Sequence, residues 1–397
     1  MNVIYDMWDA SNREVLLSIP LYILAGTIMA RGEIAERLIN LMKELTRPVP
    51  GGLAIAALLS CGVFAAISGS STVTLLAVGS ILYPALIRDG YARPFAIGLL
   101  CAGGTLGIII PPSIPLILYG VMTQKSIADL FIAGTGPAIL LLCVLGAYAM
   151  AVNWARKGDM WDIRKIVYSA RLAVFALLTP VIILGGIYSG YFTPTESASV
   201  AVITAIVVEV FAHRHGFIYL VTGNWEGLNK TLAEGGVLVW RVVGETARLM
   251  GSLFPILAIA LSLNVFMTYE QVPGRIVEFM TTFIDSKLLF LFMTNILLLA
   301  VGLFLDIGSA ILILSPLLPP MAADYGMDMI HFGIMMIVNL EIGYLTPPMG
   351  LNIIVAMGAF REDFLTICKG VLPFIGLMLL CLMVVMFYPP LSLFLIQ

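Results

Sequence analysis

The chain has 397 residues, of which 60% are hydrophobic and 11% are charged, and its mean hydropathy is +1.03. This composition is far more apolar than that of a water-soluble protein of the same length, so it predicts an integral, multi-pass membrane protein. The formal net charge is −3 and the basic residues are scattered through short loops, which excludes nucleic-acid binding.

Eight apolar segments are long enough to cross, or nearly to cross, a bilayer. In chain order they cover residues 15–30, 94–123, 127–152, 172–189, 197–212, 246–268, 330–359 and 370–390. Two further apolar regions, 51–87 and 287–323, are interrupted midway by small and polar residues. Each half of these regions has about 15–18 residues, so we expect two re-entrant helical hairpins whose tips stop near mid-membrane. Two short spans joined by a polar turn are the alternative.

The spans 94–123 and 330–359 each contain a Pro-Pro pair where a helix should be continuous. Proline lacks the N–H that closes a helical hydrogen bond, so each pair is expected to end one half-helix and start another. Pro111 and Pro347 lie 236 positions apart. The same shift relates Pro84 to Pro320, Gly90 to Gly326, Gly134 to Gly370 and Pro137 to Pro373. A duplicated broken span indicates a secondary transporter with its site at the bilayer midplane.

The distribution of Lys and Arg predicts how the spans are oriented, because cytoplasmic loops gather these residues. The loop 155–171 is the most basic and is placed inside. Following the chain from there, the other basic loops also fall inside if the two hairpins enter from opposite sides, so the repeats are expected to be inverted. The same count places the amino terminus outside. We expect a helix upstream of Met1; insertion of the first helix with its amino end outside is the alternative.

Residues 32–47 and 270–284 are amphipathic, which is typical of helices lying in the membrane interface, and ordinary loop helices are the other interpretation. We interpret them as arms that brace a moving part against a fixed part. The expected regions are a scaffold helix and arm (1–50), transport repeat 1 (51–152), scaffold helices and a connecting arm (153–245), a scaffold helix and the arm of repeat 2 (246–286), and transport repeat 2 (287–397).

Small and oxygen-bearing residues gather at the hairpin tips and beside the helix breaks of both copies. Hard cations such as sodium are bound by several oxygens, which hydroxyl groups and unwound backbone supply, so we predict two sodium sites, one in each copy. The assigned residues are Ser68, Gly69, Ser70, Gly104 and Thr105 in the first copy, and Asp306, Gly308, Ser309 and Thr346 in the second. The alternative is that these small residues serve close helix packing.

Three carboxylates have separate interpretations. Asp306 lies within an apolar run, where an unpaired carboxylate costs several kcal/mol, so it is expected to hold a cation or a proton or to cap a half-helix. Glu341 precedes the second break and either faces a cavity or pairs with an arm residue. Glu196 follows Thr193 at the spacing of a helix start and is expected to cap the next helix.

A new half-helix begins after each proline pair, with its partial positive end near mid-membrane, which favours an anionic substrate such as a carboxylate. The residues assigned to substrate binding are Ser71, Pro112, Ser113, Pro348, Gly350 and Asn352. For Asn352, a structural cap is the competing interpretation.

The sequence gives no sign of catalysis. The three histidines, His213, His215 and His331, form no nucleophile-base or metal-ligand pattern, and the nucleotide-binding motif Gly-x-x-x-x-Gly-Lys-Ser/Thr is absent. The five cysteines have no ligand-like spacing and are interpreted as small hydrophobic residues.

Five motifs in order resemble the large membrane subunit of tripartite ATP-independent periplasmic (TRAP) transporters, the DctM-like members of the ion transporter superfamily. They cover residues 19–26, 68–71, 103–115, 190–196 and 343–350, so the resemblance extends over nearly the whole chain. The chain departs from the family pattern in lacking an extra amino-terminal helix and in its loop 213–245, which bears on contact with the small subunit.

This resemblance implies sodium-driven import of an organic acid anion across the bacterial inner membrane by an elevator mechanism. It also implies two partners, a periplasmic solute-binding protein that delivers the anion and a small membrane subunit that stiffens the scaffold. A stand-alone carrier of the related dicarboxylate or arsenite type and a non-transporting membrane scaffold or receptor are the alternatives.

Overall fold

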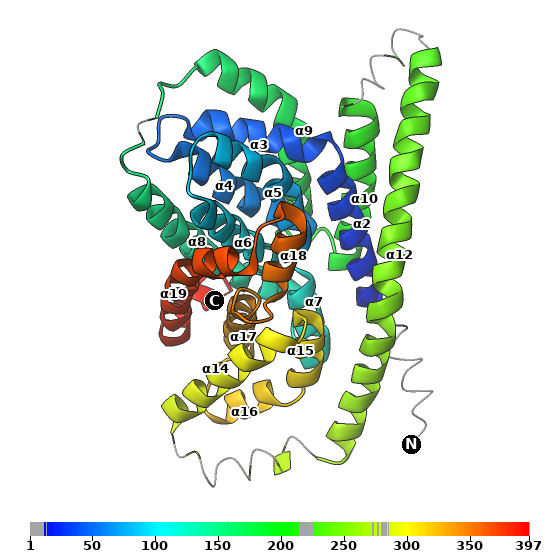
Figure 1. Ribbon diagram of the computed structural model, residues 1–397. Helices are drawn as coiled ribbons and strands as arrows, with labels where there is room; N and C mark the ends of the chain where they lie inside the picture. Colours follow the sequence, from blue (N-terminus) through cyan, green and yellow to red (C-terminus); the bar gives the residue numbers. More distant parts are fainter. Residues whose placement is uncertain are drawn as a thin grey trace.

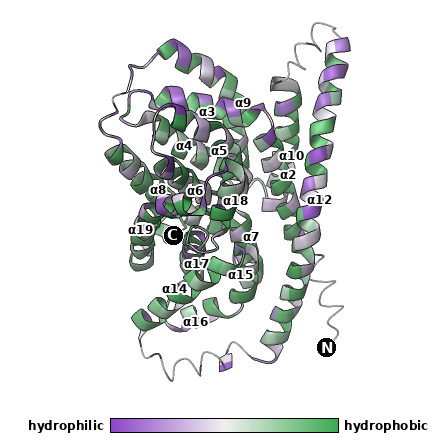
Figure 2. Cartoon of the chain, viewed as in Figure 1, coloured by the Kyte–Doolittle hydropathy of each residue, from purple (hydrophilic) through white to green (hydrophobic). Residues whose placement is uncertain are grey.

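The computed structural model describes residues 12, 14–156, 158–213, 219, 225–271, 274–275, 278, 284 and 286–396. The regular structure in these ranges is entirely helical, as predicted, and they contain no strand (Figure 1). Eight helical stretches of the described residues are long and apolar enough to cross a membrane, and a bent helix pair makes a ninth candidate. Apolar residues dominate most of these helices (Figure 2). The chain is therefore a multi-pass membrane protein.

The bounds of the elements are as follows. The first half contains η1 (Glu14–Leu17), α2 (Ser18–Arg31), α3 (Glu33–Thr46), α4 (Gly52–Ser68), α5 (Ser71–Arg88), α6 (Arg93–Ile109), α7 (Ile114–Thr123), α8 (Ile127–Val152), α9 (Ile163–Tyr188), α10 (Pro194–Val207) and η2 (Val208–His213). The second half contains α12 (Trp225–Tyr269), α14 (Lys287–Phe304), α15 (Ile307–Leu314), α16 (Leu318–Asp324), α17 (Met329–Gly343), α18 (Leu351–Phe360), α19 (Phe364–Phe387) and α20 (Pro390–Leu393).

The helix is interrupted at both proline pairs. In the first copy α6 ends at Ile109 and α7 begins at Ile114, and in the second copy α17 ends at Gly343 and α18 begins at Leu351. Proline supplies no N–H for the next helical bond, which is why each helix stops within a few residues of its pair. Both Pro-Pro peptide bonds are cis.

Each predicted hairpin region forms helices that meet at a short polar turn. In the first, α4 and α5 pack against each other and are joined by only Gly69 and Ser70. In the second, α14 is followed by Leu305 and Asp306 and then by α15. The returning helix of the second region is bent by 53° between α15 and α16, where Pro319 and Pro320 open the new helix.

The first broken span and α17 of the second form the interior of the molecule, while α12 lies at its edge. Buried residues make up 83% of the apolar window of 93–123 but only 22% of that of 225–267. α6 contacts α4, α5, α8 and α19, whereas α2 contacts α10 and α12 as well as α3, α4 and α5. In Figure 1, α2, α10 and α12 stand as a column beside the body formed by the remaining helices.

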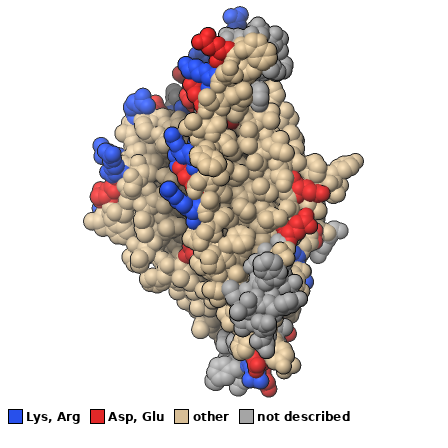
Figure 3. Space-filling model, turned by 90° about the vertical axis from the view of Figure 1, so that its right-hand side faces the viewer, with Lys and Arg blue, Asp and Glu red and all other residues tan. Residues whose placement is uncertain are grey.

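α12 is longer than the sequence predicted. The expected span 246–268 is only the second part of one continuous helix that starts at Trp225, so α12 runs through the boundary placed between 153–245 and 246–286. The polar first part is held by contacts that sequence hydropathy does not report, among them an ion pair of 2.9 Å between Arg31 and Glu245. Figure 3, which looks onto this side, shows charged side chains gathered towards the top and a largely uncharged middle.

The first amphipathic arm is present as α3. Its buried side chains include Ile34, Leu38 and Met42, which recur at helical spacing on one face. The backbone N–H of Glu33 donates to both carboxylate oxygens of the buried Glu209 at 3.2 and 3.0 Å, which satisfies one free N–H at the start of the helix. The second predicted arm, 270–284, lies mostly outside the described residues.

Candidate transport site

The first hairpin tip forms a cluster of uncharged oxygens. Ser68 ends α4 with its hydroxyl 2.7 Å from that of Thr74 and 3.3 Å from the carbonyl oxygen of Ser70. Both hydroxyl-bearing residues are buried. Gly69 turns the chain with φ of +59°, a conformation that glycine adopts at little cost. Three neutral oxygens so close together suit a hard monovalent cation, so Ser68 and Ser70 fit the predicted sodium chemistry.

This tip lies directly on the first helix break. A Cβ atom added at Gly69 would lie 2.6 Å from the carbonyl oxygen of Pro112, and one added at Gly107 would lie 2.8 Å from that of Ser70. The glycines at both positions therefore allow the backbone of the tip to approach the backbone of the break. The first hairpin tip and the first break are therefore in direct contact, and that they form one site stays a prediction.

One of the two carbonyl groups freed by the first proline pair is satisfied by a side chain. In a regular helix the N–H of residue 112 would donate to the carbonyl of Ile108, and Pro112 has none. The hydroxyl of the buried Ser113 donates to this carbonyl instead and accepts from the N–H of Leu116 at 3.4 Å. Ser113 thus caps α7, so its hydroxyl is already bonded within the chain and is not a free donor for an anion.

Gly104 and Thr105 do not lie in unwound backbone, contrary to our prediction. α6 continues to Ile109, because the first missing N–H, that of Pro111, affects only the carbonyl four residues before it. The Thr105 hydroxyl donates to the carbonyl of Ala102 at 2.7 Å. A Cβ at Gly104 would lie 3.0 Å from the Cβ of Leu75 on α5, so the alternative role in close helix packing accounts for this glycine.

The second hairpin tip is organised around Asp306. Its carboxylate accepts from the N–H of Ser309 at 2.9 Å and from the Ser309 hydroxyl at 2.5 Å, which makes it the amino-terminal cap of α15. Capping was one of the three roles that the sequence left open. Asp306 is exposed, although its position within an apolar run predicted that it is buried in apolar surroundings. Gly308 follows in the first turn of α15.

This tip also touches the break of its own copy. The N–H of Ile307 donates to the hydroxyl of Tyr344 at 2.8 Å. The backbone of the break folds back on itself, since the carbonyl of Tyr344 accepts from the N–H of Asn352 at 3.2 Å and that of Thr346 accepts from Gly350 at 3.2 Å. The Thr346 hydroxyl donates to the carbonyl of Ile342 at 2.8 Å. These carbonyls, expected to be free, are hydrogen-bonded within the break that contains Pro348.

Each hairpin tip contacts the half-helix of the other copy as well. The hydroxyl of Ser71 lies 3.0 Å from Oδ1 and 2.7 Å from Nδ2 of Asn352, and Nδ2 also donates to the carbonyl of Cys101 at 3.3 Å. On the other side α15 packs against α7, where a Cβ at Gly308 would lie 3.5 Å from a methyl group of Leu118. Asn352 therefore links the two copies, which favours neither of the two roles predicted for it.

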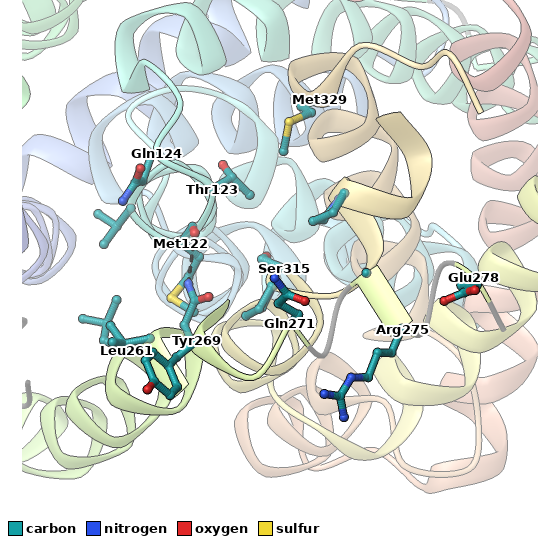
Figure 4. Close-up of a pocket in the computed structure, with 16 residues that line it drawn as sticks. Met122, Thr123, Gln124, Leu261, Tyr269, Gln271, Arg275, Glu278, Ser315 and Met329 are labelled. Atoms are coloured by element: carbon teal, nitrogen blue, oxygen red, sulfur yellow. Dashed lines mark hydrogen bonds between the residues drawn. The ribbon is translucent and has the colours of Figure 1, made fainter. Parts of the chain in front are cut away.

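A cavity lies away from the residues predicted for the site. It has a volume of about 880 Å³ and is lined by the end of α7, the end of α12, the turn of α15 and α16, and four residues of 270–284 (Figure 4). Its polar and charged lining residues are Thr123, Gln124, Asn264, Tyr269, Gln271, Arg275, Glu278 and Ser315. None of these was assigned to the site from sequence, because they come from segments with no shared motif.

Two residues near the second break, Tyr344 and Glu341, were not assigned to the site from the sequence. Tyr344 holds the second tip through its hydroxyl. Glu341, one turn earlier in the chain, is fully buried on α17. The only signal for Tyr344 was its place in the motif 343–350. Within the described residues no three His, Cys, Asp or Glu side chains are grouped as they are around a transition metal.

Comparison with known proteins gives consistent matches. The family profile of the tripartite ATP-independent periplasmic transporter DctM component matches residues 1–391. The C4-dicarboxylate TRAP transporter large permease protein DctM of Pseudomonas aeruginosa is 39% identical over 390 residues, 98% of this chain and 87% of that protein. The isethionate TRAP transporter permease protein DctMQ of Oleidesulfovibrio alaskensis is 37% identical, over 96% of this chain and 58% of that protein.

Two further matches are more divergent: one carries a different substrate in its name, and the other has a low sequence identity. The ectoine TRAP transporter large permease protein TeaC of Halomonas elongata is 32% identical over 96% of this chain and 86% of that protein. The crystal structure of the Alcanivorax borkumensis YdaH transporter superposes with a TM-score of 0.66, covering 98% of this chain and 89% of that one at 14% identity. At that identity the likeness concerns the fold alone.

Proposed function

Since this chain belongs to the family of the DctM component of tripartite ATP-independent periplasmic transporters, we propose that it drives import of an organic acid anion with sodium ions, by an elevator movement. The family works with a small membrane subunit and a periplasmic binding protein, and its members are transporters rather than enzymes. For this chain we propose both partners, a lipid environment, and a location in the bacterial inner membrane.

The observation that carries the proposal is the reciprocal packing of the two copies. The first tip touches its own break at Pro112 and the other copy at Asn352, and the second tip touches its own break at Tyr344 and the other copy at Leu118. A pair of copies related by an approximate two-fold axis makes such paired contacts. The packing supports an inverted repeat with re-entrant hairpins.

The proposed moving part consists of the two copies, α4–α8 and α14–α19, because their tips and breaks are interlocked. The proposed fixed part includes α2, α10 and α12, which stand together at the edge (Figure 1). The two parts meet where α2 packs directly against α4 and α5, and α3 contacts both α2 and α4. An elevator mechanism slides one such body along the other while the site itself keeps its shape.

Sodium is the proposed coupling ion, bound at two sites. In the first copy the hydroxyl groups of Ser68 and Thr74 with the carbonyl of Ser70 supply neutral oxygens. In the second copy the carboxylate of Asp306 beside the hydroxyl of Ser309 supplies a charged one. A hard monovalent cation bound there would be held by oxygens only, which matches its chemistry.

The proposed substrate is a carboxylate-type anion. The relatives named above carry C4-dicarboxylate, isethionate or ectoine in their names, so the family serves more than one substrate. The half-helix α7 begins near the first tip and α18 begins after the second break, and the amino-terminal end of each carries a partial positive charge that favours an anion. The cavity with Arg275 between α12, α7 and α16 supports a route by which an anion reaches them (Figure 4).

Transport in proteoliposomes tests the proposal. The chain is reconstituted with the small-subunit and binding-protein products of neighbouring genes, and uptake of radiolabelled organic acids is followed with a sodium gradient, a potassium gradient or no gradient. Uptake that requires both sodium and the binding protein supports the proposal. Uptake that does not depend on sodium contradicts the proposal that sodium is the coupling ion. Uptake without the binding protein identifies a stand-alone carrier instead.

A further inference from the structure

A basic pocket lies between the arm α3 and the first turns of α9, and it includes no residue of either hairpin tip or either break. It has a volume of about 280 Å³, and the two helices that form it pack against each other (Figure 1). The lining residues recur at intervals of three and four along each helix, so each helix turns one face towards the pocket. Six of the eight can donate hydrogen bonds: Arg37, Asn40 and Lys43 of α3, and Lys165, Tyr168 and Ser169 of α9.

Most of these donors have no partner in the part of the chain that the structure describes. Four of the six side chains form neither a hydrogen bond nor an ion pair there, namely Asn40, Lys43, Tyr168 and Ser169. The other two have a carboxylate beside them, since Arg37 bonds to Glu33 at 2.7 Å and Lys165 lies 3.8 Å from Asp162. The pocket therefore offers more donors than the protein itself uses.

The charge of the lining favours an anion. Its three basic side chains face one carboxylate, that of Glu44, which gives a formal excess of two positive charges. Glu44 has a basic neighbour of its own, since Arg47 lies 3.7 Å away and is not part of the lining. A phosphate group has several charged oxygens that can accept from such donors at the same time, so its chemistry fits this pocket.

Contacts beyond the pocket fix its two walls relative to each other. The indole Nε1 of Trp161 donates to the carbonyl of Leu45 at 3.0 Å, and Arg47 forms an ion pair of 2.9 Å with Asp159. Both contacts tie the end of α3 to the segment that leads into α9. Donors that are already held in place lose less freedom when a ligand binds, which favours affinity.

The pocket lies where α9 changes from polar to apolar. This helix is apolar enough to cross a membrane, and all its basic side chains precede Leu172, the apolar residue of the lining. Beyond it the exposed side chains are largely apolar, among them Phe175 and Leu178. Tyr168 is 65% exposed, and tyrosine is enriched at the level of lipid headgroups. A ligand seated here has donors around its charged end and an apolar helix face beside its other end.

We propose that this pocket binds the phosphate headgroup of an anionic phospholipid, whose acyl chains lie along the apolar face of α9 that begins at Leu172. The phosphate oxygens accept from Lys43 of α3 and from Lys165 and Ser169 of α9, so the bound lipid joins the arm to a membrane-crossing helix. Basic pockets at the ends of membrane helices bind anionic headgroups in this way. The site is separate from the sodium and substrate sites of the proposed function.

Retention of lipid by the full chain is the first test. The chain is purified in detergent and mixed with equal amounts of phosphatidylglycerol and phosphatidylcholine, and the bound lipid is identified by native mass spectrometry. The wild type should retain phosphatidylglycerol in preference. The double variant Lys43→Gln and Lys165→Gln should bind it about 30-fold more weakly, because each lysine near a membrane surface contributes about fivefold.

Two further variants separate the pocket from a general attraction between basic residues and anionic lipid. Arg164→Gln with Arg171→Gln removes the same charge from α9 outside the lining and should retain phosphatidylglycerol as the wild type does. Ser169→Phe fills the pocket without changing the charge and should lose the preference. Equal loss in the arginine control, or unchanged retention in Ser169→Phe, overturns the proposal.

Thermal unfolding of the wild-type chain is the second test and does not depend on a variant that folds. Nanodiscs of phosphatidylcholine that contain phosphatidylglycerol should raise the Tm above that in phosphatidylcholine alone, and inorganic phosphate added to the latter should not. No rise with phosphatidylglycerol, or an equal rise with inorganic phosphate, overturns the lipid as the ligand. Neither test needs transport, so failure here is distinct from failure of the proposed function.

Discussion

The contact between Ser71 and Asn352 should be energetically coupled, because it joins one copy to the other at the site. Ser71 is 3% exposed and Asn352 is fully buried. The Ser71 hydroxyl bonds to the amide at 3.0 and 2.7 Å, and Nδ2 has a second acceptor in the carbonyl of Cys101. Substituting Ser71 by alanine therefore leaves Oδ1 without its described partner, while Nδ2 keeps one.

The expected loss of stability follows from these hydrogen bonds. A buried acceptor left unsatisfied costs about 1–3 kcal/mol in water-soluble proteins, and hydrogen bonds between membrane helices average about 0.6 and reach about 1.7 kcal/mol. We expect a coupling energy of about 1–2 kcal/mol between the two residues, which changes the unfolding constant about 5- to 30-fold.

A double-mutant cycle measures the coupling. Ser71→Ala, Asn352→Leu and the double variant are unfolded in mixed micelles at one pH and salt concentration. The control cycle pairs Ser71→Ala with Ser189→Ala, whose hydroxyl is exposed and bonded only to its own helix. That cycle should be additive. A Ser71–Asn352 coupling below about 0.5 kcal/mol would refute the argument that this contact holds the copies together.

Three further substitutions test other parts of the structure. In Gly69→Ala the new methyl group is placed at a positive φ and collides with the carbonyl of Pro112, whereas Gly190→Ala has a positive φ but open space around it. Gly69→Ala should therefore reduce stability and uptake more than Gly190→Ala. Equal losses in thermal unfolding and uptake would contradict this. Tyr344→Phe leaves the N–H of Ile307 without its partner and should cost about 1–3 kcal/mol in equilibrium unfolding, whereas no change would show that the second tip is held otherwise. Hydrogen bonds from the N–H and hydroxyl of Thr193 lower the pKa of Glu196. The stabilisation by the Glu196 carboxylate is therefore present at neutral pH and is lost as pH falls through the lowered pKa. Glu196→Gln should remove this acid-dependent part of the unfolding profile, and an unchanged profile would argue against the cap.

The features that could be predicted from the sequence depend on local chemistry. A proline pair removes helical N–H groups wherever it occurs, so the ends of α6 and α17 were readable at Pro111 and Pro347. The capping role of Glu196 follows in the same way from its spacing to Thr193, and the structure confirms it as a capping box.

The features that were missed depend on tertiary contacts. The break was predicted to free carbonyls as far back as Gly104, but a missing N–H releases only the carbonyl four residues earlier, so α6 continues to Ile109. The side-chain partners of Ser71 and of Ile307 come from other segments of the chain, and no spacing in the sequence reveals them. The polar half of α12 was expected to be a connecting arm because its hydropathy is low, although packing and an ion pair to Arg31 keep it helical.

The link between Ser71 and Asn352 also has a consequence for biosynthesis. The partner of Ser71 lies 281 residues further along the chain. At a synthesis rate of about 5–20 residues per second, the first hairpin therefore waits roughly 15 to 60 s in the membrane before its partner emerges from the ribosome. During that interval the nascent tip exposes hydroxyl groups to lipid or to the insertion machinery, which makes the amino-terminal half the part of this protein most dependent on help while it is being made.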